Sequence, residues 1–267
     1  MAREISSISR IGTSEPFELQ VARGQISYHN SLHKFGYNPE IGVDAETVWT
    51  IGGSYTYLPS ASTLYVSSSD ANDTSAGTGA RTVQVYGLDA NYDEVNVTVS
   101  LSGQSAVQLG EASNWIRVFR MVVRSAGSSG QNVGTLYVGT EATPASGVPV
   151  STYASIAIGD NQTLMCVWTV PRGYTAYLHQ KDVSASSSAG KFAIFTLEAR
   201  PFGEVMQVKD RVLLANNSTA ISYWNPISFS EKTDIEVRAQ ADSVGGTVTA
   251  SATLDITYIL NGAELDG

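Results

Sequence analysis

The sequence contains one cysteine in 267 residues, Cys166. A single thiol cannot form a disulfide within the chain, and it cannot supply the set of thiolate ligands that structural zinc sites use. Cys166 lies inside the apolar run LMCVWTV, so we expect a buried and unreactive side chain rather than a nucleophile. The chemistry that depends on paired cysteines is therefore excluded.

Charge is also scarce, because only 15% of the residues are charged, against about a quarter in an average protein. Acidic residues outnumber basic ones by 25 to 16, which gives a net charge of −9, and no Lys/Arg cluster occurs. Binding to phosphate backbones needs a dense cationic face, so we expect no nucleic-acid partner. The polar surface must consist of Ser, Thr, Asn, Gln and Gly, which is typical of β-rich proteins that pack against neighbours.

Long apolar runs are missing as well. No stretch approaches the length of about 20 residues that a membrane-spanning helix needs. The first twelve residues, MAREISSISRIG, lack the apolar centre of a secretory signal. We therefore expect no membrane partner and synthesis in the cytoplasm.

The sequence instead contains alternating strands. In the stretch Thr74–Leu101, apolar residues at 95, 97, 99 and 101 alternate with Asn, Thr and Ser, and a turn at 87–94 precedes them. This period of two is typical of a half-buried strand, and the stretch predicts a β-hairpin. The longest alternation runs over Thr247–Leu260. Trp115–Arg124 is apolar on both faces, which predicts a central strand, and only Val208–Ala215 is a candidate helix.

The pattern predicts an all-β protein with two β-sandwich or jelly-roll-like domains and an extended N-terminal arm. The arm comprises residues 1–50 and carries two short strands, Phe17–Val21 and Gln25–Tyr28. The first domain covers residues 51–147 and the second covers residues 148–267. The boundary falls in EATPASGVPVST at 141–152, where Pro, Gly and Ser are concentrated.

Few residues suggest catalysis or metal binding. His29 and His33 have a spacing that would suit a metal on a helix, but Gly and Pro follow closely and no acidic pattern supports such a site. His179 has no GxSxG motif to accompany it. Among the acidic residues, Glu198, Glu204 and Asp210 are close in sequence, yet nothing assigns them as the carboxylate pair of a glycoside hydrolase. We expect no catalytic residues, no metal ligands, no cofactor and no enzyme activity.

Two acidic loops have the alternating oxygen ligands of a calcium site. One is the turn DANYDE at 89–94, and the other contains Asp70, Asn72 and Asp73. The first lacks the Gly at the sixth position and the Glu at the twelfth position of an EF-hand loop. Both are interpreted as turns, with calcium binding as the alternative. The GTGA segment at 77–80 lacks the GK[ST] ending of a phosphate loop.

Tyrosine is abundant, with 13 residues, and Tyr37, Tyr55, Tyr57 and Tyr92 are placed on loops by the pattern. Exposed tyrosines are favourable contact residues at protein interfaces. They also stack on sugar rings, so carbohydrate binding remains an alternative, as does ordinary packing at strand edges.

Three segments resemble a family of virion structural proteins of tailed bacteriophages, especially short-tailed marine ones. The resemblance covers about the first half of the chain and is carried by HKFGYNPEIG with ETVWTIGGSY (33–55), TSAGTGARTVQVYGLDANYDE (74–94) and RVFRMVVRSAGSSGQNVGTLYVG (117–139). It implies a component of the phage particle.

From this resemblance and the composition, we expect a capsid decoration or cement protein that binds the major capsid protein on the head surface. We expect it to be a homo-oligomer, preferably a trimer, that joins the virion in the host cytoplasm. A tail, adaptor or fibre component and a host-glycan-binding attachment module are the alternatives.

Overall fold

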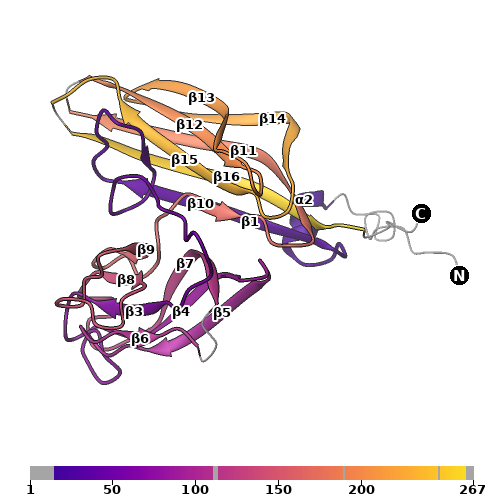
Figure 1. Cartoon of the computed structure of the whole chain (residues 1–267). Helices are drawn as coiled ribbons and strands as arrows, with labels where there is room; N and C mark the ends of the chain where they lie inside the picture. Colours follow the sequence, from indigo (N-terminus) through magenta and orange to yellow (C-terminus); the bar gives the residue numbers. More distant parts are fainter. Residues whose placement is uncertain (1–14, 111–113, 189, 246, 263–267) are drawn as a thin grey trace, which may run out of the picture.

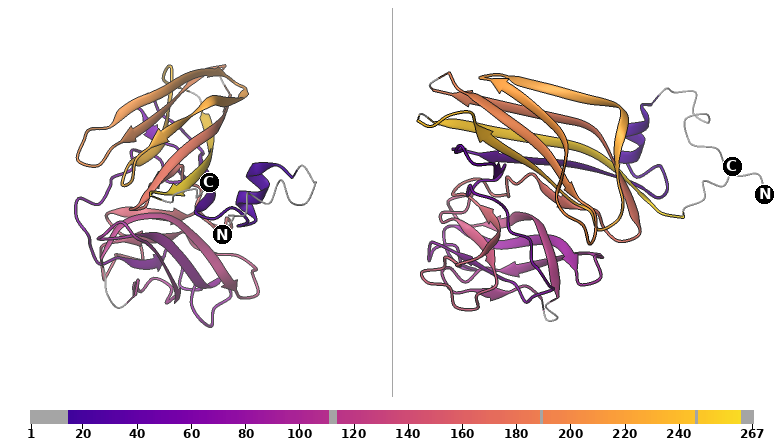
Figure 2. Two further views of the ribbon diagram at one scale, coloured as in Figure 1. Left: turned by 90° about the vertical axis from the view of Figure 1, so that its right-hand side faces the viewer. Right: turned by 45° about the horizontal axis from the view of Figure 1, so that its top comes forward.

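The computed structural model describes residues 15–110, 114–188, 190–245 and 247–262, and it confirms an all-β fold built from antiparallel sheets. The strands form a larger sandwich and a smaller unit packed along one side of it (Figures 1 and 2). Within the described residues the only helix is α2 (Phe17–Ala22). No helix of that part of the chain is long and apolar enough to cross a membrane.

The larger unit consists of two facing sheets. One has the strand order β1-β16-β11-β14, and the other has the order β10-β15-β12-β13 with β2 paired to β15. Their bounds are β1 (His29–Asn38), β2 (Glu46–Thr47), β10 (Val167–Thr169), β11 (Tyr174–Ser187), β12 (Phe192–Arg200), β13 (Gln207–Ala215), β14 (Ser218–Phe229), β15 (Asp234–Ala241) and β16 (Val248–Leu260). The alternation predicted for 247–260 is confirmed, since Ala250, Ala252 and Leu254 of β16 are buried while the residues between them are partly exposed.

The smaller unit contains a sheet of order β6-β3-β8-β9 and a sheet of order β5-β4-β7. Their bounds are β3 (Tyr65–Ser68), β4 (Ala80–Asp89), β5 (Glu94–Ser100), β6 (Val107–Gln108), β7 (Trp115–Ala126), β8 (Leu136–Gly139) and β9 (Thr152–Ile156). The predicted hairpin is confirmed, because Val83 pairs with Val99 and Val85 with Val97. β9 pairs with β8, so this unit continues beyond residue 147 and includes the end of the segment expected as a linker.

The extended arm predicted for residues 1–50 is wrong for its described part. β1 pairs along its whole length with β16, and β2 pairs with β15, so residues 29–38 and 46–47 are strands of the larger sandwich. The alternation of β1 is hidden in the sequence because its buried positions are Lys34, Gly36 and Asn38, which do not read as apolar. Residues 1–14 of the predicted arm lie outside the described part.

Three further predictions of local structure are corrected. Phe17–Val21 is helical rather than extended, and Pro16 at φ −54° precedes the helix, which suits proline's fixed φ. Gln25–Tyr28 is a turn that ends at Tyr28 with φ +65°. The helix candidate at 208–215 is the strand β13, because its half-buried and buried residues Val212 and Leu214 alternate with exposed ones.

β7 is not the central strand that its two apolar faces predicted. It lies at the end of the order β5-β4-β7 and pairs with β4 on one side. Trp115, Val118 and Met121 are nevertheless buried, since the larger unit packs against this strand through β10. A strand can therefore be apolar on both faces because another sheet covers it.

Candidate interaction surface

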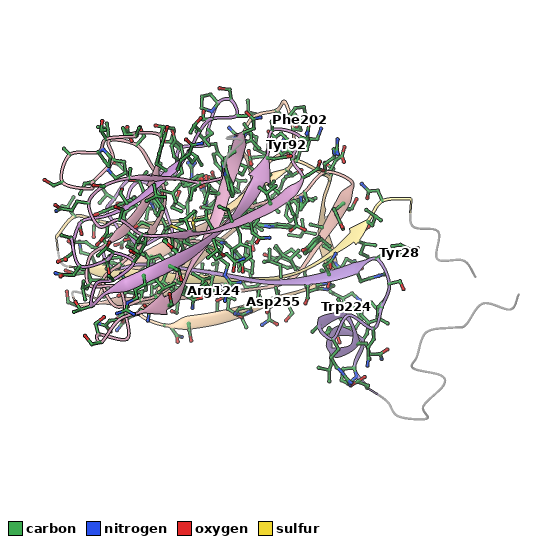
Figure 3. The ribbon with its side chains drawn as sticks, turned by 90° about the horizontal axis from the view of Figure 1, so that it is seen from below. Tyr28, Tyr92, Arg124, Phe202, Trp224 and Asp255 are labelled. Carbon is green, nitrogen blue, oxygen red and sulfur yellow. The ribbon has the colours of Figure 1, made fainter. Side chains whose placement is uncertain are left out.

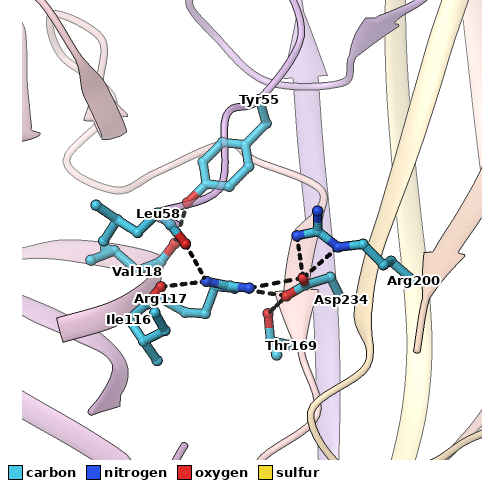
Figure 4. A network of polar contacts seen from close by, with 8 residues as sticks. All are labelled: Tyr55, Leu58, Ile116, Arg117, Val118, Thr169, Arg200 and Asp234. Carbon is cyan, nitrogen blue, oxygen red and sulfur yellow. Dashed lines mark hydrogen bonds and ion pairs between the residues drawn. The ribbon is translucent and has the colours of Figure 1, made fainter. Parts of the chain in front are cut away.

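A buried ion pair joins the two units (Figure 4). Arg117 of β7 donates from Nε to Asp234 Oδ1 at 2.7 Å and from Nη2 to Oδ2 at 3.0 Å. Asp234 begins β15 and also accepts from Arg200 Nη2 at 2.6 Å and from Thr169 Oγ1 at 2.6 Å. The Arg117 and Asp234 side chains are only 7% and 3% exposed. Burial acts to lower the pKa of Arg117, but its hydrogen bonds and charge interaction with Asp234 outweigh burial and raise that pKa, so the guanidinium remains charged.

The same guanidinium also secures the backbone of the smaller unit. Its Nη1 donates to the carbonyl oxygens of Leu58 at 3.1 Å and Ile116 at 2.7 Å. Nearby, Tyr55 Oη donates to Val118 O at 3.2 Å (Figure 4). All of these contacts of Arg117 are made to groups of the same chain, so the network connects the larger unit to the smaller one.

The turn DANYDE, which carries part of the family resemblance, docks on the larger unit. Within the turn, Asp89 Oδ1 accepts from the backbone N–H groups of residues 91 and 93 at 2.8 and 3.0 Å, as in an Asx turn. Arg172 bonds both Asp93 oxygens at 3.0 and 2.7 Å, and its backbone N–H donates to Tyr92 O at 2.8 Å. The Tyr92 ring meets the Phe202 ring edge-on with centroids 5.7 Å apart (Figure 3). The carboxylates of this turn therefore have structural partners.

Asp73 explains the second acidic loop. It is fully buried, and its Oδ1 accepts from the backbone N–H groups of Ala80 and Val133 at 2.7 and 3.0 Å. Its Oδ2 accepts from Gly134 N and Ser68 Oγ, both at 2.7 Å. The carboxylate thus joins the loop between β3 and β4 to the loop between β7 and β8, which accounts for an acidic residue at a buried position.

Lys34 is a buried cation at the boundary between the units. Its Nζ donates to the carbonyl oxygen of Phe119 on β7 and lies 5.8 Å from the centre of the Phe119 ring. Burial lowers the pKa of Lys34 to about 7, and no carboxylate contact is among the causes of that shift. The contact joins β1 of the larger unit to β7 of the smaller one.

The histidines that suggested a metal do not converge. His29 and His33 share the outer face of β1, but their spacing of four positions along a strand places them about 13 Å apart. His33 Nδ1 contacts Asp255 Oδ1 at 2.6 Å, and the His29 ring packs against Phe17. His33, His179 and Asp255 line a surface pocket of about 370 Å³ beside α2, and in the described residues no group of three or more potential ligands could hold a metal ion.

The remaining reactive groups are separated or inert. Cys166 is fully buried, and burial raises the pKa of its thiol to about 12.

The three acidic residues considered as a carboxylate pair lie on different faces. Glu198 contacts Arg238 on the outer face of its sheet, whereas Asp210 points inward, opposite the buried Leu197. Burial acts to raise the pKa of Asp210, but hydrogen bonds from Lys181 and Tyr223 and the charge of Lys181 lower it. Glu204 accepts a hydrogen bond from the half-buried Gln207 side chain, so the three acidic residues form no facing pair.

Of the four tyrosines expected on loops, Tyr37 lies in β1 instead, and Tyr55 and Tyr57 do not present their hydroxyl groups to solvent. Tyr55 is 5% exposed, and the Tyr57 hydroxyl is buried, with the Arg200 guanidinium 4.5 Å from the ring centre. Tyr92 is half-buried against Phe202, and only Tyr37 is exposed. Tyr55 and Tyr57 lie in the segment that connects the two units, which explains why a loop position is buried.

The free edge of the larger sandwich presents apolar side chains to solvent. β13 and β14 are the last strands of their sheets and run along the side away from the smaller unit (Figure 1). Trp224 of β14 is 97% exposed, while Val208 and Leu213 of β13 are 53% and 56% exposed. Trp224 lies well apart from the Tyr92–Phe202 pair in Figure 3.

Trp224 lies in a bulge of β14. Along the β11–β14 pair, Gln180 faces Ser222 whereas Leu178 faces Ile227, so residues 223–226 oppose the single residue His179. Pro226, which lacks a backbone donor, is tolerated at such an edge position. Sequence reasoning missed this edge because a tryptophan suggests a core position. The available signal was the absence of any charged residue between Arg211 and Glu231.

Comparisons with known proteins do not assign the chain to a family. No protein-family model matches the chain, and no curated protein matches it. Structural similarity is weak. The structure of infectious bursal disease virus Gx strain has a TM-score of 0.26 at 10% identity, over 88% of this chain and 73% of that one. The VP2 subviral particle of the same virus has a TM-score of 0.23 at 11% identity, over 90% and 73% of the two chains. The PBSX exported protein XepA has a TM-score of 0.19 at 10% identity, over 84% and 86%. Scores this low carry no argument about the present chain.

Proposed function

We propose that the chain is a structural component of a phage particle that binds the major capsid protein on the outer surface of the head and stabilises it. It acts as a decoration or cement protein in several copies, preferably three, and catalyses no reaction. It joins the particle in the host cytoplasm.

Exposed apolar side chains on the two edge strands β13 and β14 carry this proposal. Trp224, Leu213 and Val208 remain in contact with water in the isolated chain, which favours an assembly partner. Acidic residues considered for chemistry or calcium binding are instead used in structural contacts, such as Asp210 with Lys181 and Asp73 with backbone N–H groups. The resemblance of three segments to virion proteins supplies the biological setting.

The test is the location of the chain on purified particles. Particles made by the phage that encodes the chain are imaged by electron cryo-microscopy, and the chain is quantified by mass spectrometry. We expect density for the two-unit body on the capsid surface at a fixed ratio to the major capsid protein. Density confined to the tail would establish the tail, adaptor or fibre alternative, and absence from the particle would overturn the proposal.

Particles that lack the chain provide the functional half of the test. We expect heads assembled without it to release their DNA at a lower temperature than complete heads. Adding back the purified chain restores the original release temperature. Equal release temperatures with and without the chain would contradict a cementing role.

A host-glycan-binding module is the second candidate, and the 97% exposed indole of Trp224 favours it, because aromatic side chains stack on sugars. Glycan binding by the isolated chain that is lost in Trp224→Ala would support this alternative. The same binding retained in that variant would remove the observation on which the alternative rests.

A further inference from the structure

We propose that the β14 edge, with Trp224 at its bulge, is the surface through which copies of this chain bind one another. This inference assigns a contact surface within the oligomer of the proposed function. It commits to a second copy of the chain as the occupant of the edge.

The first step is that the edge is unpaired. β14 hydrogen-bonds to β11 on one side, and among the described residues no strand pairs with its other side. An unpaired edge offers a row of backbone N–H and C=O groups to another strand. Its regular part is Ser218–Ser222, because the bulge and Pro226 interrupt the edge beyond that point.

The second step is charge. Natural edge strands are usually protected by charged side chains that disfavour pairing, but β14 has none, and the uncharged stretch extends from Val212 to Ser230. The chain as a whole carries a net charge of −9, so two copies repel each other over most of their surfaces. The uncharged edge is a place where two identical surfaces can meet without opposing like charges. This argument favours a copy of the chain over a partner of complementary charge.

The third step is the exposure of the Trp224 side chain. Trp224 is 97% exposed, while the other three tryptophans, Trp49, Trp115 and Trp168, are at most 4% exposed. Tryptophan is among the residues most enriched at interface positions that dominate binding energy. Burying this indole in a contact removes the largest side chain on the edge from water.

The geometry of the contact follows from symmetry. Two β14 strands that pair antiparallel form a two-fold interface, with the same residues contributed by each copy. In the expected trimer, β14 would instead contact a different surface of the next copy, because a three-fold contact joins two unlike surfaces. Both arrangements bury Trp224, and the measured mass of the oligomer distinguishes them.

The experiment measures the mass of the full chain by light scattering and analytical ultracentrifugation over a range of concentrations. Four proteins are compared: the unchanged chain, Trp224→Lys, Ala220→Lys and the control Val150→Lys. Val150 is a 93% exposed apolar residue outside the β13–β14 edge. We expect oligomers for the unchanged chain and the control, and at least an approximately 30-fold weaker self-association, about the loss of one interface hot spot, for the two edge variants.

Tryptophan fluorescence supplies a second readout that does not depend on mass. Trp224 should give the unchanged chain a red-shifted, iodide-quenchable emission on dilution, and that component should shift to the blue at high concentration. Trp224→Phe should lose it at all concentrations. Circular dichroism identifies any variant that fails to fold, and the shift of the unchanged chain with concentration then tests the proposal without a variant. An emission that stays red-shifted while the mass rises would overturn it.

An unchanged chain that remains monomeric at the concentrations used, or a Trp224→Lys oligomer as strong as that of the control, would overturn the inference. Neither result bears on whether particles contain the chain. Conversely, absence of the chain from particles would overturn the proposed function while leaving the self-association result intact.

Discussion

At the scale of single residues, the most informative side chains are the charged ones that are buried. Lys34, Arg117 and Asp234 are each less than 10% exposed, and all three lie where the two units meet. Charged residues are rarely buried without partners, because the loss of hydration must be offset by hydrogen bonds and opposite charge. The sequence does not reveal these partners, since Arg117 and Asp234 are 117 residues apart.

Replacing Asp234 by Asn tests how much the buried ion pair with Arg117 contributes to stability. The amide keeps the shape of the carboxylate but removes its charge, which leaves the buried guanidinium of Arg117 without a counter-ion. We expect a loss of about 3–5 kcal/mol in the free energy of unfolding, measured with urea at pH 7. Asp93→Asn is the control at the exposed pair with Arg172, and its cost should stay below about 1 kcal/mol. Equal losses in the two variants would contradict the importance assigned to the buried pair.

Lys34 predicts a pH dependence of stability. Its pKa is about 7 in the folded chain and near 10.5 when the residue is free of the fold. Between these two values the unfolded chain holds a proton that the folded chain has released, so stability rises with pH by up to about 1.4 kcal/mol per pH unit. Below pH 7 both states hold the proton, and the cost of burying the charge is fully present.

The measurement compares urea unfolding of the unchanged chain and Lys34→Met at pH 7 and pH 9. Because all other titrating groups are common to both proteins, their difference isolates Lys34. We expect the unchanged chain to gain about 2 kcal/mol relative to the variant between these two pH values. A difference that stays constant with pH would show that the Lys34 ammonium remains charged in the fold.

At the scale of strands and turns, the sequence pattern predicts a strand only where apolar residues occupy its inward positions. β5 and β16 were predicted because valine, alanine and leucine alternate with Thr, Ser and Asn. β1 was missed because its inward positions hold Lys34, Gly36 and Asn38. The edge at Trp224 was not recognised because neither the free side of β14 nor its bulge is visible in the sequence.

Gly36 explains why a glycine occurs at an inward position of β1. A Cβ atom there would overlap the carbonyl oxygen of Val48 and the backbone N of Cys166. These two atoms are hydrogen-bonded to each other at 2.9 Å, beside the strand. The glycine therefore lets three backbone segments approach closely, including two from the first segment of the family resemblance.

Gly36→Ala should consequently destabilise the chain by about 1–3 kcal/mol or more, because backbone atoms cannot move aside as a flexible side chain can. Ser186→Thr is the control, since it adds one methyl group at an exposed position of β11 and should change the free energy of unfolding by less than about 0.5 kcal/mol. Thermal melts followed by circular dichroism compare the two. A Gly36→Ala chain as stable as the control would refute the close approach.

At the scale of the whole molecule, the two units share one interior. Their buried apolar residues form a single connected cluster that includes Met121 of the smaller unit and Trp168 of the larger one. Three kinds of polar contact reinforce it: the Arg117–Asp234 pair, the DANYDE turn on Arg172, and Lys34 on Phe119 O. The domain boundaries expected from composition do not mark two independent bodies, because β1 and β2 precede the smaller unit in sequence but belong to the larger one.

This arrangement predicts that the chain unfolds as one cooperative unit. Proteins with two loosely connected domains usually unfold in separate steps, whereas elements that share a core lose their packing together. We expect one calorimetric peak whose enthalpy equals the van't Hoff value, with the same midpoint by tryptophan fluorescence and near-ultraviolet circular dichroism. Two resolved peaks would mean that the contacts between the two units do not couple their unfolding. A single peak would imply instead that a particle contact made by either unit stabilises the other, because neither can unfold without losing the shared interior.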